Sequence, residues 1–194
     1  MGGAAGNKAS PGGLRPTKLK TRGGGCASGH RQIPRKPSLS RPPNTLSVPS
    51  QVIVADALPA IYTTSAQGTG QGAILIAGTA SLAAANGAFP GSRPVQSGEY
   101  LSIYCSGLGA VANAPANGQP APSSPPFATT IEKPTVTVGG VTASVVSYSG
   151  LAPGEIGLYQ VNVQLPNGVP SGSAVPVQIV LGSAISNIVT IGVQ

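Results

Sequence analysis

Side chains that commonly act in enzyme chemistry are scarce in this 194-residue chain. Its only histidine is His30, and its two cysteines are Cys26 and Cys105. A Ser–His–Asp or Cys–His arrangement needs a base beside its nucleophile. Because residues 49–194 contain no histidine, we predict that they hold no site of this kind.

The four carboxylates are spaced too widely to suggest a pair: Asp56, Glu99, Glu132 and Glu155. Each lies singly near an expected turn or strand end, whereas glycosidic hydrolysis uses two carboxyl groups that face each other. We therefore expect solvated turn carboxylates. A weak calcium site at Asp56 or Glu155 with backbone carbonyls is the alternative, and no Cys/His zinc pattern is present. We predict no catalytic residue, no cofactor site and no required metal.

Three other groups of residues have spacings that could serve a site. Residues 68–72 read Gly-Thr-Gly-Gln-Gly, but no lysine or helical pattern follows, so we expect a turn rather than a phosphate loop. Cys105 is expected to be a small buried side chain, without a disulfide to Cys26. The tyrosines could form a carbohydrate-stacking platform if several share a face, and otherwise they are core or rim residues. They are Tyr62, Tyr100, Tyr104, Tyr148 and Tyr159.

The positive charge of the chain is concentrated in its first part. Residues 1–50 carry nine Lys/Arg and no Asp/Glu, whereas residues 51–194 carry two Lys/Arg and four Asp/Glu, so +9 and −2 give the net +7. Residues 1–48 are rich in Gly and Pro, and their apolar residues show no period. We predict a disordered basic tail at 1–48 and a globular module at 49–194. The tail could attract nucleic acid, but no aromatic residues interleave its charges.

The module shows short runs of strand-forming residues separated by turn residues. In residues 158–165, apolar side chains alternate with Leu158 and three amides, Gln160, Asn162 and Gln164. About eight short strands at intervals of roughly 8 to 12 residues predict an all-β, Ig-like sandwich of two antiparallel sheets, held by buried apolar faces. The runs are 51–55, 58–64, 72–77, 99–105, 134–138, 141–148, 158–165, 175–181 and 188–193.

Local signals in the module refine this prediction. Residues 78–94 are expected to be mostly loop, with one helical turn possible at 81–85. Residues 110–130 contain five prolines and predict a long surface loop in which Phe127 folds back onto the body. Pro176 lacks an N–H and suggests an edge strand or a strand start. A Gly-Gly pair after residue 138 suggests a hairpin turn.

Several segments of the module together resemble a known family. They are 60–63 (AIYT), 68–73 (GTGQGA), 98–104 (GEYLSIY), 107–109 (GLG), 136–143 (VTVGGVTA), 150–154 (GLAPG) and 157–163 (GLYQVNV). These segments resemble the uncharacterised C-terminal domain that recurs in acidobacterial (Solibacter-type) secreted proteins, over about residues 50–194. The Gly-Leu-Gly turn, the Val-Gly-Gly hairpin and the last strand are more distantly similar to IPT/TIG immunoglobulin-like domains.

The resemblance implies an Ig-like module at the end of larger exported or cell-surface bacterial proteins, with no established activity and no catalytic residue to transfer. No signal peptide or run of about 18 apolar residues is visible. We therefore expect no membrane span, and a truncated or wrongly started product of a larger chain.

The function expected from these observations is that of a noncatalytic structural or adhesive module, not an enzyme. It would contact a protein or a surface polysaccharide through sheet edges, by added strand pairing, or through the loop at 110–130. Two alternatives stay open: a nucleic-acid-associated protein that binds phosphates through its basic tail, and a carbohydrate-binding module.

Overall fold

The computed structural model describes residues 55–194. The predicted tail at 1–48 and nearly all of the predicted strand at 51–55 lie outside these residues. Within them the chain forms ten strands and no helix. The described part therefore contains no helix with the length and apolarity needed to cross a bilayer.

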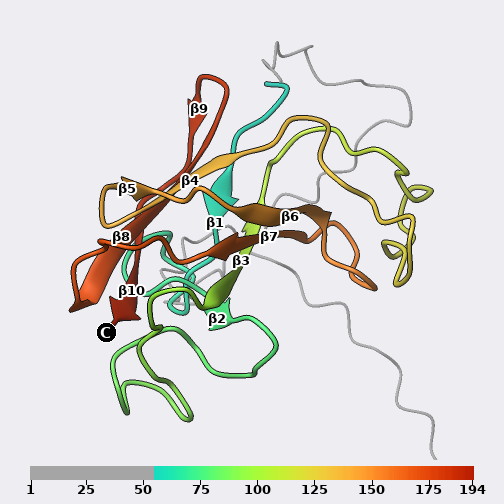
Figure 1. Cartoon of the computed structure of the whole chain (residues 1–194). Helices are drawn as coiled ribbons and strands as arrows, with labels where there is room; N and C mark the ends of the chain where they lie inside the picture. The colour runs from blue at the N-terminus through green and yellow to red at the C-terminus, as the bar shows by residue number, and fades with distance from the viewer. Residues whose placement is uncertain (1–54) are drawn as a thin grey trace, which may run out of the picture. The chain divides into compact units, whose positions relative to one another are not determined.

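The strands form two sheets of five, and every named strand pair is antiparallel (Figure 1). In the first sheet, β1 and β2 both pair with β3, which is followed by β7 and then β6. These strands are β1 (Ala60–Ile61), β2 (Ile74–Ile76), β3 (Tyr100–Ser106), β6 (Val146–Leu151) and β7 (Tyr159–Gln164). In the second sheet the order is β10, β8, β4 and β5, and β9 also pairs with β8. These strands are β4 (Thr135–Val138), β5 (Val141–Thr142), β8 (Gly172–Leu181), β9 (Ala184–Ile185) and β10 (Val189–Val193).

One apolar core joins the two sheets. In β7 and β8 every second side chain is buried, and β3 buries Leu101, Ile103 and Cys105 in the same alternation, with Ser102 buried as well. Because side chains alternate between the two faces of a strand, this pattern turns one face of each sheet inward. The predicted all-β sandwich is confirmed. Fully buried members of its core include Leu101, Ile103, Cys105, Val161, Val163, Val177, Ile179 and Ile191.

The run predicted as a single strand at 141–148 is divided between the two sheets, so that prediction was wrong. β5 follows the Gly139–Gly140 turn and pairs with β4, as the predicted hairpin requires. The chain then crosses to the first sheet, where β6 pairs with β7. Ala143 lies at the crossing with its side chain in the core, and its N–H donates to the Val136 carbonyl at 2.8 Å.

The helical turn considered at 81–85 does not form. Leu82 bridges to Leu75 of β2, and Ala83 bridges to Arg93. The Ala83 N–H donates to the Ile74 carbonyl at 2.9 Å, so this backbone continues the sheet hydrogen bonding instead of closing on itself. The rest of 78–94 is turn and loop, as predicted.

Pro176 lies inside β8, the longest strand, with β10 on one side and β4 on the other, so the predicted edge or start position was wrong. Its register partner in β10 is Thr190. On the other side the β4 ladder ends at Val138, opposite Val177. The Pro176 carbonyl accepts a hydrogen bond from Gly139 at 2.7 Å, and the missing N–H faces this turn, beyond the end of β4.

The loop at 110–130 packs onto the sandwich as predicted. The Phe127 ring meets the Tyr148 ring edge-on, with centroids 6.1 Å apart. A second apolar cluster forms beneath the loop from Ala121, Ala128 and Leu151. The loop is therefore anchored to β6 and the chain that follows it.

Other segments cover the edges of both sheets. Beside β10, the Val95 and Thr190 N–H groups donate to the Gly192 and Gly70 carbonyls. Beside β1, the Asn187 side chain takes the place of a strand: its Oδ1 accepts from the Ile61 N–H at 2.7 Å, and its Nδ2 donates to the Ile61 carbonyl at 3.0 Å. The backbone N–H and C=O groups that a sheet leaves unpaired at its edges are thus largely hydrogen-bonded here.

Candidate functional site

The outer surface of the first sheet gathers four of the five tyrosines. Residues paired across antiparallel strands point to the same face, so the register fixes which side chains share it. Tyr100 pairs with Gln164, and Tyr104 pairs with Gln160. We call this surface the tyrosine face. It consists of Tyr62, Tyr100, Tyr104, Tyr148, Gln160, Asn162 and Gln164, together with the buried Ser102 and its register partner Leu75.

Tyr62 and Tyr104 are neighbours across the β1–β3 pair. The Tyr62 N–H donates to the Tyr104 carbonyl at 3.1 Å, one residue beyond the Ile61–Cys105 pair. Tyr62 is 47% exposed. Because an aromatic ring offers a flat apolar surface with a polar hydroxyl at its rim, the exposed Tyr62 ring and the half-buried Tyr104 ring beside it can stack against a ligand and donate hydrogen bonds to it.

An amide row from β7 lies next to the tyrosines. Gln160 Nε2 donates to Asn162 Oδ1 at 2.8 Å, and Gln164 Nε2 donates to the Gly98 carbonyl at 3.0 Å. These bonds orient the amides and leave further donors and acceptors, since each amide group has two donor hydrogens and an oxygen with two lone pairs. The row therefore offers polar contacts between the aromatic side chains.

Tyr148 closes the far side of the face, on β6. Its hydroxyl donates to the Leu151 carbonyl, and burial raises the pKa of this phenol. A Cβ at Gly150 would lie 2.1 Å from the Ala128 carbonyl oxygen and 2.9 Å from the Tyr148 hydroxyl oxygen, so only glycine fits beneath the ring. Tyr62 and Tyr148 are on strands three spacings apart, about 14 Å.

Tyr159 does not belong to this face. It pairs with Cys105, on the inward side, and its hydroxyl donates to the Gly109 carbonyl. Burial raises its pKa, and Cys105 adds to the shift. The structure therefore divides the predicted tyrosines into four on the outer face and one that packs against the core.

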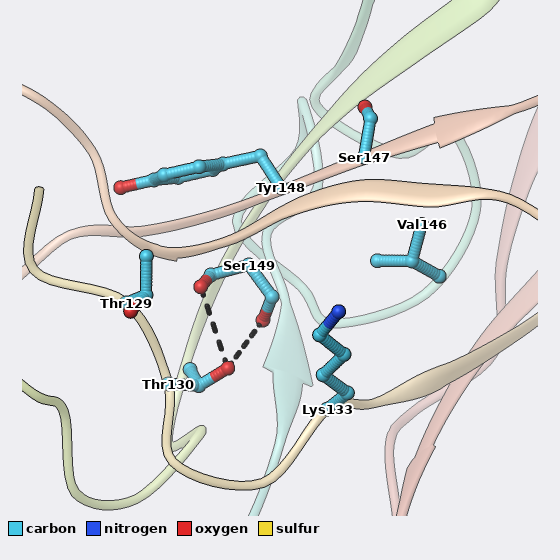
Figure 2. A pocket seen from close by; sticks show the side chains of 7 residues that line it. All are labelled: Thr129, Thr130, Lys133, Val146, Ser147, Tyr148 and Ser149. Carbon is cyan, nitrogen blue, oxygen red and sulfur yellow. Dashed lines mark hydrogen bonds between the residues drawn. The ribbon is translucent and has the colours of Figure 1, made fainter.

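A groove of about 200 Å³ lies between β6 and the segment that leads into β4 (Figure 2). Thr130 Oγ1 donates to Ser149 Oγ at 2.9 Å, and the Thr130 N–H donates to the Ser149 carbonyl at 2.9 Å. β6 has a register shift between Val146 and Tyr148, and Figure 2 shows Lys133 extending toward this strand. A bulge and a lysine are features that prevent another strand from pairing at an edge.

A second, apolar hollow of about 420 Å³ lies at β1. We call it the β1 hollow; it is lined by Ala60, Ile61, Tyr62, Thr63, Ala66, Gly68 and Asn187. Tyr62 belongs to both the hollow and the tyrosine face. Ala66 has a φ of 56°, a left-handed conformation that alanine rarely adopts. Sequence analysis missed the roles of Ala66 and Asn187, because only the tertiary fold brings these residues to β1.

The expectation that all four carboxylates are solvated singly was wrong for Glu99. Arg93 donates two hydrogen bonds to it, at 2.7 and 2.9 Å, and the Gln96 N–H donates a third at 2.8 Å. The hydrogen bond from Arg93 is the main cause that lowers the pKa of the Glu99 carboxyl. Asp56 and Glu132 line the same two hollows at one end of the module, so they are not isolated either.

The other residues considered for chemistry occupy different places. Cys105 is fully buried, as predicted, and desolvation raises the pKa of its thiol to about 12. Cys26 and His30 lie outside the described residues. Gly68 and Gly70 adopt positive φ in a loop that pairs with β10. Within residues 55–194, no three His, Cys, Asp or Glu side chains, Glu155 included, are grouped as metal ligands.

Comparison with known proteins adds no relative. No protein-family model, curated protein or solved structure matches this chain. The assignment of function therefore rests on the geometry of the tyrosine face and its surroundings.

Proposed function

We propose that this chain is a noncatalytic adhesive module that binds an uncharged polysaccharide through the tyrosine face. The observation that carries the proposal is the placement of Tyr100 and Tyr104 beside the β7 amides, with the exposed Tyr62 next to Tyr104, on one sheet face. Sugar rings present apolar C–H surfaces and peripheral hydroxyls, which match aromatic rings and amides respectively.

The charge of this face favours a neutral ligand. The tyrosine face contains no Asp, Glu, Lys, Arg or His residue. Binding to a phosphate polymer depends on Lys and Arg that replace its counterions, and no such residue is in the face. The basic segment that suggested nucleic-acid binding lies outside the described residues, so nothing in the geometry favours that alternative.

The sheet edges offer less support for recognition by strand pairing. The Asn187 side chain occupies the β1 edge, and the bulge in β6 interrupts the edge beside Lys133. A broad face between such edges is the more suitable contact surface. We retain the exported or cell-surface setting in this proposal, because a module of this kind meets polysaccharides outside the cell.

The test is a depletion assay of the full chain on insoluble polysaccharides, with cellulose, chitin and xylan as probes. We expect at least one probe to bind. The double variant Tyr62→Ala, Tyr104→Ala should weaken that binding at least about tenfold, because each stacking ring contributes on the order of 1 kcal/mol. Ile185→Ala is the control, since this exposed residue lies on β9, in the other sheet. Retained affinity in the double variant, or no binding to any probe, would overturn the proposal.

A further inference from the structure

We infer that the tyrosine face takes an internal segment of an extended polysaccharide chain, and that the axis of this chain runs along β3. This inference rests on the proposed function, and it states which form of polysaccharide the face accepts and in which direction. The competing arrangements are a chain that crosses the strands and a chain end that occupies only Tyr62 and Tyr104.

The tyrosines of β3 are spaced for an extended ligand. Tyr100 and Tyr104 lie on the same face of this strand, four residues and therefore about 14 Å apart. Tyr62 lies beside Tyr104, so aromatic rings are present at two separate places along β3. One sugar ring stacked at either place cannot reach the other. A chain of several sugar units along the strand contacts both.

The outward amides of β7 follow the same direction. They are the register partners of the outward residues of β3, namely Gln164 with Tyr100, Asn162 with Ser102, and Gln160 with Tyr104. A chain along β3 therefore has a side-chain amide beside it at each step between the two tyrosine positions. These amides can donate to and accept from the hydroxyl groups along one side of the chain.

The path across the strands is closed at β6. Beyond β7 the next outward position is Gly150, and the Tyr148 hydroxyl oxygen lies 2.9 Å from the place that a Cβ of Gly150 would take. The Tyr148 side chain therefore covers this position. The Phe127 ring packs edge-on against the Tyr148 ring, with centroids 6.1 Å apart. A chain that crosses the sheet meets these two rings directly after β7.

The path along β3 is open at both ends. Beyond Tyr100, a Cβ at Gly98 would meet only Gln164 Nε2, at 3.9 Å, so no other described residue stands close to it. Beyond Tyr104, the outward residues are Ser106 and its register partner Ala60, which are both small, and Ala60 is exposed. A bound chain can extend past the face in both directions, which is why we specify an internal segment.

The test is titration calorimetry of the full chain with soluble oligosaccharides of the polysaccharide that binds in the depletion assay. For cellulose, chitin or xylan, the disaccharide and the hexasaccharide of the same linkage are compared. The hexasaccharide should bind at least about fivefold more tightly, because it alone reaches Tyr100 in addition to Tyr62 and Tyr104. Equal affinities for the two oligosaccharides would overturn the inference.

Tyr100→Ala tests the direction of the chain. It should weaken hexasaccharide binding about fivefold and leave disaccharide binding within about twofold, because the disaccharide occupies Tyr62 and Tyr104. Tyr100 is 39% exposed, so this substitution leaves the apolar core intact. Ile185→Ala, in the other sheet, is the control and should change neither affinity. Unchanged hexasaccharide binding in Tyr100→Ala would contradict a chain that runs along β3.

The outcomes separate this inference from the proposed function. Binding to an insoluble probe without binding to its hexasaccharide would overturn the inference and leave the function standing, because the face would then need a packed surface of chains. Loss of binding in Tyr62→Ala, Tyr104→Ala with no effect of Tyr100→Ala would have the same meaning for both. Absence of binding to every probe would overturn both.

Discussion

Asn187 holds the edge of β1 through its side chain alone. All three of its hydrogen bonds go to backbone groups more than 100 residues away, at Ile61 and Gly68. A buried backbone group that loses its partner costs about 1 to 3 kcal/mol. One amide therefore fixes both the edge of the first sheet and the turn beside the β1 hollow.

We expect Asn187→Ala to lower the free energy of unfolding by about 3 kcal/mol, because the Ile61 N–H and two carbonyls lose their partner. Urea denaturation monitored by circular dichroism measures this change. Asn167→Ala is the control: its side chain accepts one exposed bond from Ser97, so its effect should stay within about 0.5 kcal/mol. Similar losses in the two variants would contradict this account of Asn187.

The Arg93–Glu99 pair makes a pH-dependent contribution to stability. The hydrogen bond from Arg93 lowers the pKa of Glu99, so the ionised carboxylate favours the folded state. This contribution is present above the ordinary glutamate pKa and is lost as pH falls through the lowered folded value.

Glu99→Gln should therefore reduce Tm slightly at pH 7, and the difference from the parent chain should vanish in strong acid. The effect is small because both side chains are about one-third exposed. Thermal melts at pH 7 and pH 2 measure it. Glu155→Gln is the control, since this exposed carboxylate has no ion-pair partner among the described residues. A Tm difference for Glu99→Gln that grows toward low pH would rule out the pair as its cause.

The hairpin between β4 and β5 depends on two adjacent glycines in different surroundings. Gly139 has a φ of 58°, and a Cβ there would lie 3.0 to 3.1 Å from Pro170, Val169 and Val175 atoms. Gly140 has a φ of 81°, but a Cβ there would meet nothing within 4 Å. Alanine substitutions at the two glycines therefore separate the cost of backbone strain from the cost of steric crowding.

We expect Gly140→Ala to cost about 1 to 2 kcal/mol, the price of a left-handed alanine. Gly139→Ala should cost more, since its Cβ must also displace packed side chains. Equilibrium unfolding of the two variants under the same conditions gives the comparison. Equal losses of unfolding free energy in the two variants would show that the side chains around Gly139 can move to accommodate a Cβ.

Strands with clear alternation could be predicted from sequence, and those decided by tertiary partners could not. The apolar residues of β3, β7 and β8 alternate along each strand and are buried, so the inward faces of these strands were evident before the structure. The division at Ala143 gave no such signal, because β5 and β6 belong to one run of strand-forming residues. The position of Pro176 depends on where β4 ends, which β8 alone does not encode.

The candidate site was predictable to a similar degree. Tyr100 and Tyr104 share a face by alternation within β3, so their grouping follows from the sequence. Tyr62 and Tyr148 join them only through the pairing of β1 and β6 with their neighbours, which is a long-range property. The Arg93–Glu99 pair forms across a loop with no regular spacing.

The whole module depends on its central apolar layer. Ile103 is fully buried at the centre of β3, whereas Ile185 on β9 is 58% exposed. Ile103→Ala should lower the free energy of unfolding by about 2 to 5 kcal/mol, and Ile185→Ala should change it by less than about 0.5 kcal/mol. Denaturant titration measures both. Comparable values would mean that the inter-sheet layer is not the main source of stability.

The covered sheet edges have a consequence for this protein at high concentration. Amyloid growth needs an open, regular edge on which the next molecule can align. Here an asparagine amide, a bulge and returning loops interrupt those margins. Many molecules can therefore be held at a high local concentration while each remains a separate, folded unit.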